Sequence, residues 1–268
     1  MPKVNVYLPD ELAEAVRAAR VPISAVCQRA LAEAVERVTT ARRAAEAMRQ
    51  PDFDLTRVPQ LGARLAERMT PRLQEALRLG RDLTGSQRLI DTKDLLIGML
   101  EEGGNFALGV LQALDVDSEA LREAALAAEP DEPVLATPGA SEPTGGAVPP
   151  PSAGEGAEAI PRLLGDLGAS ARAALASALE AAIDLGHNYV GTEHLLIGLA
   201  RNANSGAGRL LDAFGIDASS ATRAIGIALA GYSQGRRQAA ANATTHAQLD
   251  AILARLERLE ARLGTTAH

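Results

Sequence analysis

Hydrophobic and polar residues alternate at the start of the chain and then change to helical spacing. Lys3, Asn5 and Tyr7 alternate with apolar neighbours, which predicts one strand with a polar and an apolar face. Two helical segments follow, separated by a turn at residues 21–24, where Ser24 is the expected N-cap of the second helix. One strand and two helices cannot pair the strand's backbone groups or bury its apolar face alone. We therefore expect a homodimer, in which two strands form an antiparallel ribbon over four helices.

The longer part of the chain contains one pattern twice, at an offset of 100 residues. The better-defined copy is residues 186–200, GHNYVGTEHLLIGLA. At this offset identical residues align in two groups: Thr92, Leu95, Leu96, Ile97 and Gly98 with Thr192, Leu195, Leu196, Ile197 and Gly198, and Ala107, Leu111, Ala113 and Asp117 with Ala207, Leu211, Ala213 and Asp217. A period of this kind indicates one supersecondary unit used twice. Each copy predicts a helix, a tight turn, a second helix that begins near a Thr, and a third helix.

The remaining segments have distinct compositions. A basic helical continuation that includes Arg42 and Arg43 is expected to be a solvated helix face, and the Pro- and Gly-containing stretch after it a tether. A long stretch rich in Pro, Gly, Ala, Ser and Glu predicts a disordered linker. Near the C-terminus, apolar residues spaced 3, 4, 3, 4 form a heptad seam typical of a coiled coil, with docking of that helix on its own domain as the alternative. The expected organisation is a ribbon-and-two-helix domain (1–50), tether (51–63), first repeat (64–128), linker (129–159), second repeat (160–232) and coiled-coil helix (245–264).

Composition supports a mainly α fold. Hydrophobic residues make up 47% of the chain but aromatic residues only 2%, so the core must consist of small aliphatic side chains, which favours helices. The net charge is −7, although residues 1–50 carry eight basic and six acidic residues, a net of +2. The single Cys27 excludes an intramolecular disulfide and a cysteine-based zinc cluster. No apolar run is long enough to span a membrane, so we expect a cytoplasmic protein.

The chain is not expected to be an enzyme. Its only lysines are Lys3 and Lys93, and neither follows a glycine-rich phosphate-binding loop. No nucleophile–base pair or paired carboxylates stand out either, and no cofactor is expected.

The repeated motif resembles the Clp repeat. Two such repeats form the N-terminal receptor domain of Clp unfoldases, most closely of the ClpC type, and the resemblance covers residues 64–127 and 160–232. It implies a double Clp-repeat helical domain that receives degrons, arginine-phosphorylated proteins or Clp-targeting cyclic-peptide antibiotics. The Clp ATPase engine that usually follows is not present in this sequence.

The start of the second helix in the second repeat is the best candidate ligand site. With Thr192 as N-cap, the first free amides would bind an anion and the Glu193 carboxylate a guanidinium. The resemblance implies that Thr192, Glu193 and His194 bind phosphoarginine. In the first repeat Lys93 and Asp94 replace the acid and the histidine, so that site is reversed in charge. The alternative is that these residues only cap a helix; a metal bound by His187, Glu193 and His194 is disfavoured because no fourth ligand is evident.

The N-terminal pattern resembles the ribbon-helix-helix repressors of the MetJ/Arc type. The resemblance implies that Lys3, Asn5 and Tyr7 enter the major groove and that the amides near Ser24 clamp a phosphate; a ribbon used only for dimerisation is the alternative. The combined expectation is a non-catalytic autorepressor that binds DNA at its own promoter and acts as a decoy or sensor for ligands of the Clp receptor domain. The other interpretation is an adaptor that binds the Clp protease machine and changes its choice of substrate.

Overall fold

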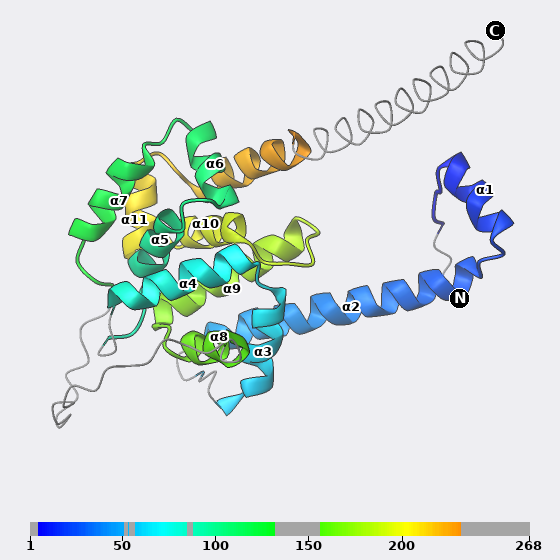
Figure 1. Cartoon of the computed structure of the whole chain (residues 1–268), viewed down its shortest axis with the longest axis horizontal. Coiled ribbons are helices and arrows are strands. Elements are labelled where there is room, and N and C mark those ends of the chain that lie inside the picture. The colour runs from blue at the N-terminus through cyan, green and yellow to red at the C-terminus, as the bar shows by residue number, and fades with distance from the viewer. Residues whose placement is uncertain (1–4, 51–52, 54–56, 85–87, 132–155, 232–268) are drawn as a thin grey trace, which may run out of the picture.

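The computed structural model describes residues 5–50, 53, 57–84, 88–131 and 156–231, and over these residues the protein is helical (Figure 1). The mainly α fold class predicted from composition is confirmed. The helices are α1 (Asp10–Ala18), α2 (Ile23–Met48), α3 (Pro59–Arg68), α4 (Pro71–Thr84), α5 (Thr92–Glu101), α6 (Phe106–Ala113), α7 (Ser118–Ala127), α8 (Gly156–Gly165), α9 (Ala169–Asp184), α10 (Thr192–Arg201) and α11 (Gly206–Ala213), followed by a helical segment at 218–231.

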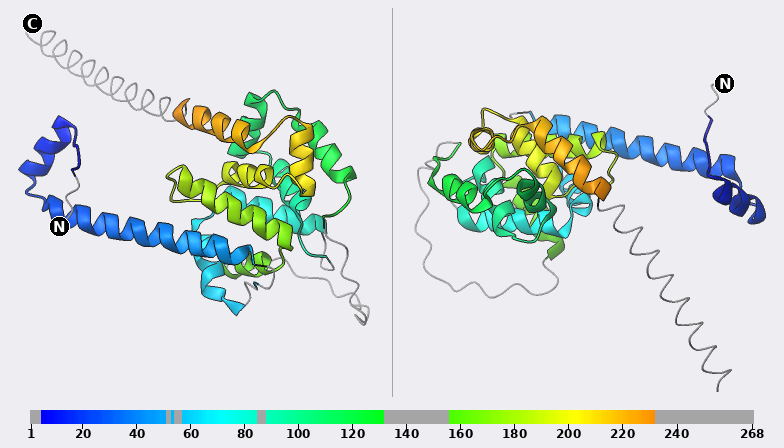
Figure 2. Two further views of the ribbon diagram at one scale, coloured as in Figure 1. Left: turned by 180° about the vertical axis from the view of Figure 1, so that it is seen from behind. Right: turned by 90° about the horizontal axis from the view of Figure 1, so that it is seen from above.

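Helices α3–α7 and the set from α8 to the segment 218–231 follow the same order. In each set the second and third helices pack against each other, α4 on α5 and α9 on α10. Helices α5 and α10 lie at the centre (Figure 2), and every α10 residue from Thr192 to Ala200 is buried. The sequence offset therefore corresponds to a spatial duplication around two central helices.

The two repeats exchange backbone hydrogen bonds reciprocally. Met69, just before α4, forms a parallel bridge with Val190, and Leu167, just before α9, forms one with Ile90. The Thr70 amide donates to the Val190 carbonyl at 2.9 Å, and the Ile90 amide donates to the Asp166 carbonyl, also at 2.9 Å. Because each repeat supplies the partner for the other's extended segment, neither satisfies these backbone groups alone.

The repeats begin earlier than the sequence indicated. Helix α3 starts at Pro59, inside the expected tether, and α8 starts at Gly156, inside the expected linker. The two helices pack against each other, and their buried residues, such as Leu65 and Leu164, join the common core. Pro59 at the first position of α3 favours a helix start, whereas α8 begins at Gly156 and carries Pro161 inside the helix.

The expected N-terminal strand is not formed by its described residues. Residues 5–9 carry no strand structure and are largely exposed, because a strand needs a backbone partner and none is provided within one chain. The prediction of Ser24 as N-cap is wrong: α2 begins at Ile23 after Pro22, without a side-chain cap. Proline's fixed φ suits a helix start, so no capping side chain is required there.

Helix α2 is one uninterrupted helix of 26 residues, about 39 Å long at 1.5 Å per residue. Its N-terminal half projects from the body with α1 at its end (Figure 1). Its C-terminal half packs on α9 through four buried residues at helical spacing: Ala41, Ala44, Ala45 and Met48. Arg49 then forms a bidentate ion pair with Glu180 of α9, with one N–O distance of 2.6 Å. Arg42 and Arg43 are exposed, as predicted for a solvated helix face, while the opposite side of the same stretch is docked on α9.

Several sequence predictions lie outside the described residues: Lys3, the coiled-coil helix at 245–264, and the linker between 132 and 155. Within the described residues, no helix is both long and apolar enough to cross a membrane.

Two equivalent glycines set the distance between the central helix pairs. A Cβ on Gly98 of α5 would overlap the Ala76 carbonyl oxygen of α4, and a Cβ on Gly198 of α10 would overlap the Ala174 oxygen of α9. Gly109 in α6 has nothing within 4 Å of the same position. Close backbone contact is therefore required at the first two positions only.

We expect Gly98→Ala and Gly198→Ala each to lower the free energy of unfolding by about 1–3 kcal/mol, because an overpacked backbone contact forces the helices apart. Gly109→Ala, the matched control, should be neutral or stabilise by about 0.5–1 kcal/mol through helix propensity. Urea unfolding followed by circular dichroism measures all three, and equal stability of the three variants would contradict the close-packing argument.

Candidate functional site

The site begins at the turn between α9 and α10. Gly186 ends α9 with φ +73°, a left-handed conformation that favours glycine. The amide of His187 then donates back to the Ala182 carbonyl at 2.8 Å, which closes the helix end. This turn directs the side chains of His187 and Tyr189 towards the start of α10, where their rings stack with centroids 5.2 Å apart.

Thr192 does not cap its own helix. The N-cap position of α10 is Gly191, and the Thr192 hydroxyl instead accepts from the Ala107 amide at the start of α6, at 3.5 Å. The equivalent Thr92 hydroxyl accepts from the Ala207 amide at the start of α11, at 3.1 Å. The prediction of Thr192 as N-cap is therefore wrong, because each threonine serves a helix of the other repeat, a contact that spacing along one repeat cannot reveal.

Glu193 covers the start of α10 with its own carboxylate. A Cβ on Gly191 would overlap that carboxylate, which is thus folded back over the N-cap residue. The Tyr189 hydroxyl and the backbone amide of Glu193 donate to it, while its burial raises the pKa of the Glu193 carboxyl. The carboxylate therefore occupies the start of α10, where an external anion was expected to bind.

His194 and His187 form a directional hydrogen-bond chain. The Gly191 amide donates to Nδ1 of His194 at 2.9 Å, so the proton of His194 is on Nε2. That Nε2 lies 2.8 Å from Nδ1 of His187, which must accept, and neutral His187 then carries its proton on Nε2. Burial first, and His187 second, lower the pKa of His194 to about 3, and burial lowers the pKa of His187.

This tautomer pattern argues against a metal ion. Ligand atoms of His187, Glu193 and His194 all lie within 4.8 Å of one another, close enough to suggest a site. However, coordination through Nε2 of His194 would place the proton on Nδ1, facing the Gly191 N–H, so two donors would meet. The cluster is better described as a neutral hydrogen-bond chain that holds the first turn of α10.

The first repeat builds the same turn from different chemistry. The carboxylate of Asp91 accepts from the Lys93 and Asp94 amides at 2.9 and 3.1 Å, and Asp94 accepts from the Asp91 amide at 2.9 Å. Arg88 pairs with Asp91 at 2.7 Å and with Asp94 at 2.9 Å, and the Lys93 amine donates to the Ala128 carbonyl at 2.7 Å. Burial first, and the Asp94 charge second, raise the pKa of Asp91. Arg88 and Asp91 were not among the site residues predicted from the sequence, although an Asp three residues before another Asp is a capping signal.

Asp131 is a further residue that sequence reasoning missed, since it lies at the start of the expected linker. Its carboxylate accepts from the Gly206 amide at the start of α11 and from the Thr92 hydroxyl. Arg209 lies 3.8 Å away, and the Asp131 amide donates to Asp91 at 3.2 Å. A single carboxylate thus joins the two repeats at the start of α11.

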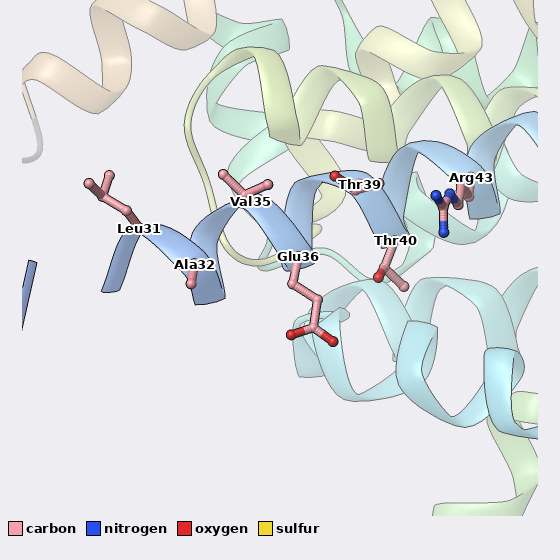
Figure 3. Close-up of a pocket in the computed structure, with 7 residues that line it drawn as sticks. All are labelled: Leu31, Ala32, Val35, Glu36, Thr39, Thr40 and Arg43. Atoms are coloured by element: carbon pink, nitrogen blue, oxygen red, sulfur yellow. The ribbon is translucent and has the colours of Figure 1, made fainter. Parts of the chain in front are cut away.

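The N-terminal site residues are exposed. Asn5 and Tyr7 precede α1, with Tyr7 98% exposed, and Ser24 lies exposed in the first turn of α2. Helix α1 buries none of its residues. Along α2, Leu31 and Val35 are 54% and 65% exposed and contribute to a shallow apolar pocket (Figure 3). The apolar side of α1 and of the first half of α2 is uncovered in the single chain.

Two family models match different parts of the chain. Residues 167–267 match the family model of the Clp repeat (R) N-terminal domain, and residues 2–50 match that of the post-segregation antitoxin CcdA. Residues 167–267 are therefore similar to a Clp repeat N-terminal domain, and residues 2–50 are similar to an antitoxin.

Individual relatives are similar over part of the chain. An ATP-dependent Clp protease ATP-binding subunit ClpA homolog of Porphyra purpurea is 32% identical over 176 residues, 64% of this chain and 17% of the relative. Chaperone protein ClpC1 of Oryza sativa subsp. japonica is 28% identical over 211 residues, 70% of this chain and 19% of the relative. The chain thus spans less than a fifth of the length of these relatives. Among solved structures, the N-terminal domain of ClpD from Arabidopsis thaliana matches with a TM-score of 0.40 and 17% identity, over 61% of this chain and 95% of that one.

We expect the histidine chain to make the protein acid-sensitive. With the pKa of His194 near 3 in the folded state and about 6.5 when unfolded, the unfolded state binds the extra proton below pH 6.5. Stability should therefore fall as the pH decreases from about 6.5 towards 3, by up to about 1.4 kcal/mol per pH unit. The raised pKa of Glu193 acts in the opposite direction, with loss of stability as pH rises from its ordinary value of 4.5.

His194→Asn keeps an acceptor for the Gly191 amide but does not titrate. Its stability should fall less between pH 7 and pH 5 than that of the wild type, as measured by urea midpoints at each pH. His246 lies outside the described residues, and His246→Asn is the control that should leave the wild-type pH dependence unchanged. An identical pH dependence in His194→Asn and wild type would disprove the assignment.

Proposed function

We propose that this protein is a non-catalytic regulator that binds ligands of the Clp receptor domain with its repeats and represses transcription through its N-terminal segment. The observation that carries the proposal is α2, one helix whose first half presents an uncovered apolar side and whose second half is packed on α9. A Clp-type receptor domain and an antitoxin-like segment are thereby joined without a flexible connection at residues 23–48. By binding what a Clp unfoldase binds, the protein would act as a decoy.

The DNA-binding half of the proposal rests on the uncovered apolar residues. Val6, Leu12, Val26, Leu31 and Val35 are each between 41% and 65% exposed. A soluble chain rarely leaves such a set open, and uncovered apolar patches mark interaction sites. A second copy would cover them and would pair the two N-terminal segments as a ribbon. The ribbon would present Lys3, Asn5 and Tyr7 to the major groove of the protein's own promoter.

The receptor half of the proposal places a phosphorylated arginine at the start of α10. Thr192, Glu193 and His194 are 2%, 5% and 0% exposed, so the ligand must displace the Glu193 carboxylate from the helix end. A phosphoryl group would then take the amides that favour an anion, and the released carboxylate would pair with the guanidinium. His194 would keep the Gly191 amide in place during this exchange.

The protein is proposed to lack ATPase activity, since Lys93 donates to the Ala128 carbonyl and lies at a capped helix start instead of a phosphate loop. An adaptor that contacts the Clp protease machine is the second candidate, favoured by the similarity to Clp subunits. Affinity purification separates the two, because an adaptor retains the Clp ATPase whereas a decoy retains degron-bearing or arginine-phosphorylated proteins, or cyclic-peptide antibiotics.

Leu31→Glu/Val35→Glu should convert a homodimer into a monomer and abolish a shift of DNA from the protein's own upstream region. Both side chains are exposed in the single chain, so the fold itself should persist. Arg29→Glu changes the charge by the same two units on the opposite side of α2 and should remain dimeric. Light scattering measures the oligomeric state, and electrophoretic mobility measures DNA binding. A monomeric wild type would disprove the ribbon proposal. A dimeric wild type that shifts no DNA would disprove DNA binding and show that the N-terminal segment serves dimerisation alone.

Phosphoarginine should bind the wild type and Lys93→Ala, but bind Glu193→Gln about tenfold or more weakly. Glutamine keeps an acceptor over the start of α10 but loses the charge that attracts a guanidinium, a charge-assisted contact worth about 1.5–3 kcal/mol. Calorimetric titration with the free amino acid measures the effect. Equal affinity for Glu193→Gln and wild type would show that these residues only cap α10.

A further inference from the structure

A small pocket lies where α2, the end of α3 and the α9–α10 turn meet. Its volume is about 140 Å³, and its lining includes Arg37, Arg68, His187 and Asn188, that is, residues from all three elements. At about 30 Å³ per water molecule, it holds a tetrahedral oxyanion with a little water, but not a nucleotide. The pocket is not lined by Thr192, Glu193 or His194, and it shares only His187 with the histidine chain.

The electrostatics of this pocket are unbalanced. The pKa of the half-buried Arg68 is lowered first by burial and second by the positive charge of Arg37. Within the described part of the chain, neither guanidinium has an ion pair, and no lining residue is acidic. Arg37 is itself exposed and Arg68 is half-buried, so an anion between them would offset both their mutual repulsion and the burial of the Arg68 charge.

The remaining polar groups of the pocket also suit an anion. Since Nδ1 of His187 accepts from His194, the neutral His187 ring has its Nε2–H left as a donor. Asn188 adds side-chain amide donors. Arginine presents planar pairs of N–H groups that match phosphate oxygens, so the donor set fits a phosphoryl group better than a halide.

We propose that the pocket between α2, α3 and the α9–α10 turn is a binding site for a phosphoryl anion, held by Arg37, Arg68 and the Nε2–H of His187. Because Arg37 belongs to α2 and the other two residues to the repeats, the bound anion adds a tie between α2 and the repeats. Inorganic phosphate and the phosphoryl group of a small monoester share this chemistry. The site is independent of phosphoarginine binding at Glu193.

Calorimetric titration of the full chain with inorganic phosphate, at constant ionic strength set by chloride, tests the proposal. The wild type should bind phosphate, and Arg37→Gln/Arg68→Gln should raise its Kd about tenfold or more. Arg43→Gln/Arg64→Gln, which removes two exposed arginines from the same helices, should bind like the wild type. Absence of binding to the wild type, equal Kd in the first variant, or equal loss in the control would each overturn the site.

Two further measurements make the result specific. The ¹⁵N-correlated signal of the His187 Nε2–H should shift on addition of phosphate to the wild type but not to Arg37→Gln/Arg68→Gln; an unmoved signal would remove His187 from the site. Phenyl phosphate distinguishes the sources, since binding of the ester shows a pocket open to a monoester and its exclusion shows a site for the free ion. Glu193→Gln should keep the phosphate Kd, so failure of the receptor proposal leaves this one intact.

Discussion

The structure depends on a reciprocal exchange between its two repeats. Short extended segments of the two repeats pair with each other, at Met69–Val190 and at Ile90–Leu167. In each repeat a threonine hydroxyl also accepts a hydrogen bond from a helix start of the other repeat. Buried backbone groups must be paired, so these contacts fix the relative position of the repeats more strictly than apolar packing does. The close backbone contacts at Gly98 and Gly198 act within each repeat, where they set the distance between α5 and α4 and between α10 and α9.

The sequence predicted the duplication because identical residues recur at a constant offset, and the mainly helical class because aromatic residues are scarce. It could not predict which helix each capping group serves. Thr192 sits one residue too late to cap α10, and its true partner, Ala107, is 85 residues away in sequence. Similarly, Glu193 folds back over the start of α10 because Gly191 has no side chain there, whereas Asp91 supplies the cap in the first repeat.

The boundaries were less predictable than the elements. Proline and glycine suggested a tether before residue 64 and a linker up to residue 159, yet α3 and α8 form there because they bury residues against each other. Local composition carries no information about such a distant partner. For the same reason, the continuation of α2 onto α9 was seen only as a basic helix, since its buried contact consists of three alanines and one methionine.

Asp131 lies between the two repeats in the chain, so it is synthesised before the helices of the second repeat. During synthesis the first repeat is complete before α9 to α11 exist, so the backbone groups of Ile90 lack their partners until the second repeat emerges. Asp131 is already present and already bonded to Asp91 through its amide, with its carboxylate near Thr92. The later start of α11 therefore meets a prepared acceptor. A chain cut between the repeats would separate α11 from Asp131. The second repeat alone would then fold without the acceptor that the start of α11 contacts in the intact protein.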